Sequence, residues 1–158
     1  MCVRTYAPVG QTPVLRVPLT RDHLSAIGGI TPQGRIFMQM QERAYCAEDV
    51  VAFLRLLLRK IPGKLLVIWD GASIHHSREV QQFLAMAPAG RFRVEQLPGY
   101  APDLNPDEGV WDQFKGDDLA NVSCLDPREL RGEIRTARQR LQRHPEVVRG
   151  FFREAGYG

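Results

Sequence analysis

The sequence has few features of secreted, zinc-binding or membrane proteins. Its three cysteines, Cys2, Cys46 and Cys124, have an odd count and no metal-ligand spacing, so we expect reduced thiols and no zinc site. No apolar stretch reaches the length of a membrane span, and the amino terminus lacks the apolar core of a signal peptide. Internal repeats and low-complexity tracts are also absent. We therefore expect a soluble, cytoplasmic protein with no membrane partner.

Excess charge is small as well. The 158 residues carry a net charge of +3 and have a pI near 9.0, which permits a nucleic-acid partner without requiring one. With 44% apolar and 25% charged residues, the composition is that of an ordinary globular protein. We expect a single domain over residues 1–158.

The most informative stretch is LPGYAPDLNPDEGVWDQFK, residues 97–115. It reads as a Pro/Gly-rich loop followed by a helix start, with Asn105 as the N-cap and Pro106 at the first helical position. Glu108 then falls in the first helical turn. An alternative remains open, because Asn105 and Glu108 also form an N-x-x-E capping box, which would explain both residues without any catalysis.

A second carboxylate follows the apolar run from Leu65 to Trp69, which lies between Pro62-Gly63 and Gly71. This run predicts a buried strand with Asp70 at its carboxyl end. Asp70 could equally be a turn residue, since Asp accepts hydrogen bonds from nearby backbone. A carboxylate at a strand end and another in a first helical turn can meet at one point, and such a pair holds divalent metals.

Two blocks of the sequence resemble the catalytic blocks of the DDE transposases of the mariner-type superfamily, especially its bacterial insertion-sequence branch. The first block is DGASIHHS at residues 70–77, and the second is the 97–115 stretch. The matching residues are Asp70, His75, Pro98, Tyr100, Pro102, Leu104, Asn105, Pro106, Glu108 and Trp111. The 38 positions between Asp70 and Glu108 also suit that family. One departure is Gly71, where the family usually has Asn.

The resemblance implies an α/β fold with a ribonuclease H-like mixed sheet flanked by helices. It also implies a transposase and endonuclease that cuts DNA and joins the freed 3′ ends to target DNA, with Mg²⁺ or Mn²⁺ as cofactor, two ions in the complete site. Asp70 would bridge both ions and Glu108 would bind one. Asn105, Pro106 and Trp111 would give structural support, with Trp111 packing inward. Such a protein would act at the bacterial nucleoid.

The resemblance further implies that the domain is incomplete at its amino terminus. RTYAPVGQTPVLR resembles the family segment that follows the first, central strand and its catalytic Asp, so that strand and an upstream helix-turn-helix module are missing. Asp22 is expected to be a surface turn residue and no substitute. The loss would leave two interior strand edges unpaired, so we expect low stability. A second transposase chain or an upstream fragment could supply the missing Asp.

The two histidines of the first block are poor metal ligands for this chemistry. His75 and His76 are adjacent and point apart, and hard cations prefer oxygen. His75 could contact the DNA backbone, orient the Asp70 loop, or be an ordinary exposed loop residue. Asp103 and Asp107 are interpreted as a loop residue and a helix-start residue.

A basic helix is predicted from Asp126, with Pro127 at its first position, to the residues before Pro145. Its apolar stripe would be Leu130, Ile134, Ala137 and Leu141. Arginines dominate the rest of its surface, which is typical either of a solvated face or of one that follows DNA phosphates. The candidate DNA-binding residues are His75, Lys115, Arg128, Arg131, Arg135 and Arg138. Residues 126–158 would form the carboxy-terminal basic helical segment of the same domain.

The remaining elements fit a mixed α/β order. Residues 1–17 are predicted to be an extended arm, 23–30 and 35–41 a hairpin with one covered side, and 47–61 a deeply packed helix. Ser77 would cap a further helix, 91–97 would form a strand and 147–152 a short final helix. Two functions stay open: a truncated or split transposase catalytic domain, or a non-catalytic remnant that binds DNA or an intact transposase through its arginine-rich helix.

Overall fold

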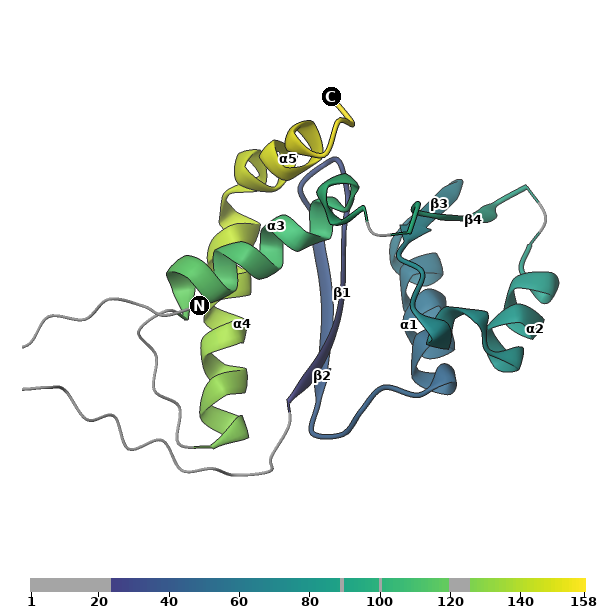
Figure 1. Cartoon of the computed structure of the whole chain (residues 1–158), viewed down its shortest axis with the longest axis horizontal. Coiled ribbons are helices and arrows are strands. Elements are labelled where there is room, and N and C mark those ends of the chain that lie inside the picture. The colour runs from purple at the N-terminus through teal and green to yellow at the C-terminus, as the bar shows by residue number, and fades with distance from the viewer. Residues whose placement is uncertain (1–23, 89, 100, 120–125) are drawn as a thin grey trace, which may run out of the picture.

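The computed structural model describes residues 24–88, 90–99, 101–119 and 126–158, and these ranges carry every element shown in Figure 1. The sequence-based expectations for the arm at 1–17, for Asp22 and for the strand start at His23 lie outside the described residues. The same holds for Tyr100, Cys2 and Cys124. Cys46 is a free, exposed thiol.

The first elements form the predicted hairpin. Strand β1 (Ser25–Ile30) pairs antiparallel with β2 (Ile36–Gln41). The Gly34 N–H donates to the Thr31 carbonyl at 2.8 Å, which closes the turn. Gly34 has φ of +88°, and a Cβ there would lie 2.5 Å from Pro145. Glycine is therefore required both by the left-handed backbone and by the close approach of another segment.

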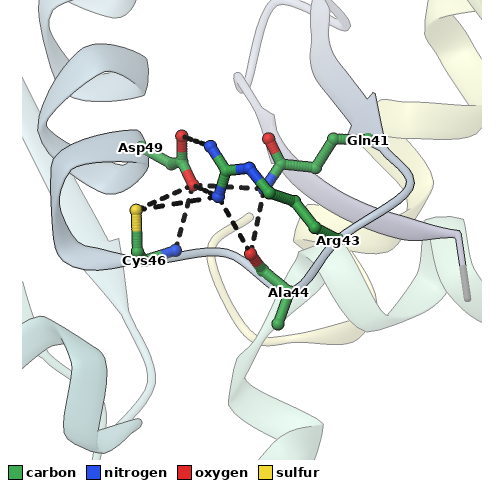
Figure 2. A network of polar contacts seen from close by, with 5 residues as sticks. All are labelled: Gln41, Arg43, Ala44, Cys46 and Asp49. Atoms are coloured by element: carbon green, nitrogen blue, oxygen red, sulfur yellow. Dashed lines mark hydrogen bonds and ion pairs between the residues drawn. The ribbon is translucent and has the colours of Figure 1, made fainter.

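Helix α1 (Ala47–Lys60) is predicted almost to the residue. Figure 2 shows how its start is held to the end of β2: Asp49 accepts from the backbone N–H of Cys46 at 3.0 Å and from Gln41 Nε2 at 3.1 Å. Arg43 donates to both oxygens of the same carboxylate, at 2.6 and 2.8 Å. Because Gln41 ends β2 and Asp49 lies in the first turn of α1, this network fixes the angle between strand and helix.

A second, parallel pair of strands follows. Strand β3 (Leu65–Trp69) pairs with β4 (Phe92–Gln96), in a register that opposes Leu65 to Phe92. Between them run the 3₁₀ helix η1 (Ser73–His76) and helix α2 (Arg78–Met86). Ser77 caps α2, because its hydroxyl oxygen accepts a hydrogen bond from the Val80 N–H at 3.5 Å. These bounds confirm the predicted strands and the Ser77 cap. The expectation that β3 is buried is wrong: none of its residues is buried, and Leu66 and Ile68 are 54% and 42% exposed because only the alternate residues Leu65, Val67 and Trp69 pack on the α1 cluster.

The two strand pairs are separate two-stranded sheets joined by α1. Five residues of α1 are buried: Val50, Val51, Phe53, Leu54 and Leu57. Their cluster receives Ile27 and Phe37 from the hairpin and Leu65, Val67 and Trp69 from β3. One helix therefore covers a face of both sheets, although neither β1 nor β3 has a second strand beside it among the described residues.

The opposite face of the hairpin carries the carboxy-terminal helices. After the 3₁₀ helix η2 (Pro102–Leu104) come α3 (Pro106–Gln113), a π-helical turn η3 (Phe114–Asp118), α4 (Pro127–Arg143) and α5 (Pro145–Glu154). Figure 1 shows α3 leaving the β4 connection and running across the hairpin. The second core cluster is Ile36, Met38, Val110, Phe114, Ile134, Ala137, Leu141 and Val148.

Two expectations about these parts need correction. The hairpin was interpreted as having one covered side, but Ile36 and Met38 face the carboxy-terminal helices while Ile27 and Phe37 face α1, so both sides are covered. The final helix is longer than residues 147–152, because Pro145 begins it. Among the described residues, no helix combines the length and the apolar character needed to cross a membrane.

Candidate functional site

Asp70 directly follows β3, at the edge where the parallel strands β3 and β4 both end. The Leu97 N–H donates to the Trp69 carbonyl at 2.8 Å, so the chain leaving β4 passes beside the Asp70 loop. The Asp70 side chain is 61% exposed. The strand end therefore presents a carboxylate to solvent next to the segment that leads to α3.

The Asp70 carboxylate is held by its own loop. Its Oδ1 accepts from the Ala72 N–H at 3.0 Å and lies 3.2 Å from His75 Nε2. The His75 ring stacks on Trp69 with 4.3 Å between centroids and 6° between planes. Burial lowers the pKa of His75, against the opposing effect of the Asp70 charge. Asp70 does behave partly as a turn residue, as the alternative interpretation allowed.

Glu108 lies in the first turn of α3 and is exposed. Asn105 caps the helix, because its side-chain oxygen accepts from the Asp107 N–H at 3.2 Å. In a capping box, Glu108 would accept from the Asn105 N–H, but that N–H donates to the Pro102 carbonyl at 2.8 Å. Helix capping therefore uses Asn105 and Pro106 as predicted and leaves the Glu108 carboxylate available.

The neighbouring Asp107 has a different surrounding. Its Oδ2 accepts from Trp111 Nε1 at 2.9 Å, and a Cβ on Gly28 of β1 would lie 3.4 Å from the same oxygen. Burial raises the pKa of Asp107 to about 6; the Trp111 hydrogen bond lowers it and the Glu108 charge raises it further. Asp107 and Trp111 thus fasten the start of α3 to β1, and Trp111 packs partly against the core as expected.

Gly71, where the resemblance predicts Asn, lies beside Gln96 at the end of β4. A Cβ at Gly71 would be 3.1 Å from Gln96 Nε2. A side chain at position 71 would therefore require the exposed Gln96 amide to shift by a few tenths of an ångström.

The donors present suit a hard divalent cation in kind. Asp70 and Glu108 both offer exposed carboxylate oxygens, which Mg²⁺ and Mn²⁺ prefer. Within the described ranges, however, no group of three or more His, Cys, Asp or Glu side chains is arranged to hold a metal ion. The described residues therefore supply at most part of a ligand set.

The arginines of the predicted basic surface differ in exposure and in whether they form ion pairs with other described residues. On α4, Arg128 and Arg135 are exposed, whereas Arg131 pairs with Glu42 at 3.4 Å and Arg138 is partly buried. Their spacing places all four on one face of the helix. Arg140 pairs with Asp118. Lys115 is exposed in η3, apart from this row in sequence.

Sequence reasoning missed three contributors to this region: Asp107 as an anchor, Gly28 as its contact and Gln96 beside Gly71. The Asp107–Trp111 spacing of one helical turn was a usable signal, since side chains four positions apart meet on a helix. The positions of Gly28 and Gln96 depend on tertiary packing, and no local pattern indicates them.

Comparison with known proteins identifies the family to which this chain belongs. A family model described as "DDE superfamily endonuclease" matches residues 3–131. This chain therefore belongs to the DDE endonuclease superfamily. Among curated proteins, none matches it.

Solved structures share the fold. The Mos1 mariner paired-end complex with Mn matches with a TM-score of 0.61 at 18% identity, covering 97% of this chain and 51% of that one. The Mos1 paired-end complex with the left transposon end and the Mos1 strand transfer complex each match with a TM-score of 0.59 at 17% identity. Both cover 98% of this chain, and 51% and 50% of theirs. The fold is thus the mixed α/β, ribonuclease H-like fold predicted above, and this chain spans about half the length of those transposases.

Proposed function

We propose that this chain supplies two carboxylates, Asp70 and Glu108, to a metal-dependent site that cleaves DNA and transfers strands in transposition. The observation that carries the proposal is the pair of exposed carboxylates at a strand end and a helix start within a DDE endonuclease domain. Both matched Mos1 paired-end complexes and the strand transfer complex are transposase assemblies, which supports DNA ends and target DNA as partners. The 97–115 motif supports the insertion-sequence branch and a bacterial, nucleoid-associated protein.

The proposed division of work is the one that the family resemblance implies, and the contacts of the two side chains leave room for it. Asp70 is held through Oδ1 by its own loop, and Glu108 has a carboxylate that helix capping does not use. Two Mg²⁺ or Mn²⁺ ions, when bound, would activate water or a 3′-hydroxyl and stabilise the leaving oxygen. In this scheme Asp70 and Glu108 are the residues of this chain that would hold the ions.

We also propose that a further strand, which the described residues do not include, inserts between β1 and β3 and brings the third carboxylate. Support comes from the two separate strand pairs under one helix: α1 covers Ile27 of β1 and Val67 of β3 in the same cluster. An inserted strand would pair with both free edges and join the sheets. It would come from an upstream fragment or a second transposase chain.

Metal-dependent nicking of element-end DNA tests the site. We expect Mg²⁺- or Mn²⁺-dependent nicking by the assembled protein, lost in Asp70→Ala and in Glu108→Ala. Glu154→Ala is a matched control, because Glu154 is an exposed acid at the end of α5, far in sequence from both proposed ligands. Full activity in both site variants would show that the assignment of the two carboxylates is wrong.

The alternative function is a non-catalytic remnant that binds DNA or an intact transposase through α4. Its supporting observation is the pair of exposed arginines, Arg128 and Arg135, on one face of that helix. Translating the nucleotide sequence upstream of Met1 in all frames separates the two functions. An apolar strand ending in Asp supports the catalytic function, and its absence in every frame supports the remnant.

A further inference from the structure

The two oxygens of the Asp70 carboxylate have different surroundings. Oδ1 accepts from the Ala72 N–H at 3.0 Å and lies 3.2 Å from His75 Nε2. Oδ2 makes no hydrogen bond or ion pair within the described part of the chain, and the side chain as a whole is 61% exposed. Among these residues, one oxygen is therefore engaged by the protein and the other has no partner.

His75 is itself held in place. Its ring stacks on Trp69 with nearly parallel planes, and its side chain is only 16% exposed. Trp69 ends β3 and packs partly against the α1 cluster, so the stack ties His75 to the sheet. A ring fixed on the sheet can restrain a carboxylate one residue beyond the strand end, which a mobile side chain could not do.

The buried ring nitrogen indicates which tautomer is present. His75 Nδ1 is buried and, among the described residues, has no hydrogen-bond partner. With the proton on Nε2, that nitrogen donates toward Asp70 and the bare Nδ1 needs no acceptor. With the proton on Nδ1, a buried N–H would be left unsatisfied, and a ring lone pair would face the Asp70 carboxylate.

We propose that His75 is a positioning residue: its Nε2–H holds Asp70 Oδ1, so that Oδ2 is the oxygen presented to a divalent cation. The cation rests on the proposed function, whereas the His75–Asp70 contact stands on the geometry alone. Of the three roles considered for His75 in the sequence analysis, this one makes the orientation of the Asp70 loop specific to one oxygen. It differs from the DNA contact and from an exposed loop residue, because the ring faces Trp69 and Asp70 and is mostly buried.

The first test is the tautomer of His75, read from long-range ¹H–¹⁵N correlation spectra at pH 8 in EDTA. We expect the Nε2–H form for His75. His76, which is exposed, serves as an internal reference for an unrestrained histidine. A dominant Nδ1–H form at His75 would overturn the proposal whatever the fate of the proposed function.

The second test is Mn²⁺ binding, measured by electron paramagnetic resonance on the wild type and on three variants. His75→Phe keeps an aromatic ring for Trp69 but removes the donor, and we expect affinity to fall by about 10-fold or more. His75→Gln retains an N–H donor and should recover part of the loss. His76→Phe should bind as the wild type does.

The possible outcomes distinguish the positioning role of His75 from the metal site of the proposed function. Wild-type affinity in His75→Phe would overturn the positioning role. If the wild-type chain itself binds no Mn²⁺, Asp70 and Glu108 do not hold the ion without the third carboxylate, and the tautomer then decides the His75–Asp70 contact. Equal losses in His75→Phe and His76→Phe would show a general disturbance of the loop and contradict a specific role for His75.

Discussion

The indole N–H of Trp111 donates to Asp107 Oδ2 at 2.9 Å, one helical turn back along α3. Because Gly28 of β1 lies against the same carboxylate, this contact joins the first turn of α3 to the edge strand of the hairpin. Glu108 is the next residue and is exposed. The neighbouring acids thus divide two tasks: Asp107 anchors the helix start, and Glu108 remains available to a ligand.

This anchor predicts a pH dependence of stability. Burial raises the pKa of Asp107 to about 6 in the folded protein, against about 4 in the unfolded chain. Between these values the unfolded state has lost the proton and the folded state has kept it, so stability falls as pH rises from about 4 through 6. In Asp107→Asn this fall should disappear, making the variant more stable than the wild type at pH 8 by up to about 3 kcal/mol.

Urea denaturation between pH 4 and 8, in EDTA so that no metal enters, measures this effect. Asp112→Asn on the same helix is the control, because its side chain is exposed and its unfolding curve should follow the wild type. Equal pH profiles for the wild type and Asp107→Asn would mean that Asp107 is not buried with a raised pKa.

Local signals in the sequence predict most of the helices and strands. The Pro62-Gly63 and Gly71 boundaries locate β3 to the residue, and Ser77, Asn105 and Asp126 mark their helix starts correctly. Such boundary residues act through backbone conformation and helix capping, which depend on a few neighbouring residues. The π-helical turn η3 has no such marker and was not predicted.

The site was predictable only in part. Asp70 and Glu108 are found from strand and helix boundaries together with a resemblance, and the structure places them at a strand end and a first turn as expected. The contacts that organise them are non-local or involve a buried atom: Gln96 against Gly71, Asp107 against Gly28, His75 on Trp69. These depend on which elements pack together, and no spacing rule for a single helix or strand contains that information.

Two helical glycines predict opposite effects of the same substitution. A Cβ on Gly109 of α3 would lie 2.6 Å from the ring of Phe151 in α5, whereas one on Gly132 of α4 would meet nothing within 4 Å. Gly109→Ala should therefore destabilise the protein by about 1–2 kcal/mol through overpacking. Gly132→Ala should stabilise it by up to about 1 kcal/mol. Thermal unfolding of both variants measures this, and stabilisation by Gly109→Ala would contradict the α3–α5 packing.

The network at the start of α1 predicts a loss of folding stability at low pH. Hydrogen bonds from Arg43 hold the pKa of Asp49 well below its usual range, with Cys46 and Gln41 adding to the effect. The stability that Asp49 contributes is therefore present above about pH 4 and is lost as pH falls toward the lowered pKa. Asp49→Asn should be less stable than the wild type at pH 7, and the difference should shrink toward pH 3. Glu79→Gln in the first turn of α2 is the control, and a difference independent of pH would argue against an ionic role for Asp49.

The exposed arginines of α4 predict a salt-dependent DNA affinity, whichever of the two proposed functions holds. Arg128 and Arg135 are exposed and have no ion-pair partner within the described part of the chain, whereas Arg131 is paired with Glu42. Each phosphate contact contributes roughly 0.9 to the slope of log affinity against log salt concentration on duplex DNA. Arg128→Gln with Arg135→Gln should therefore reduce the magnitude of that slope by roughly 2 and weaken binding on all sequences alike.

Fluorescence anisotropy on a labelled duplex over a series of salt concentrations measures the slope. Arg59→Gln is a matched control, because it removes one exposed arginine from the last turn of α1, which Figure 1 shows on the far side of the hairpin from α4. If the double variant keeps the wild-type slope, α4 is a solvated face and DNA must be held elsewhere. The control removes one arginine and should keep the wild-type slope if the binding surface is specific to α4. If it instead reduces the slope by as much per arginine as the double variant does, DNA binding depends on overall charge and not on α4.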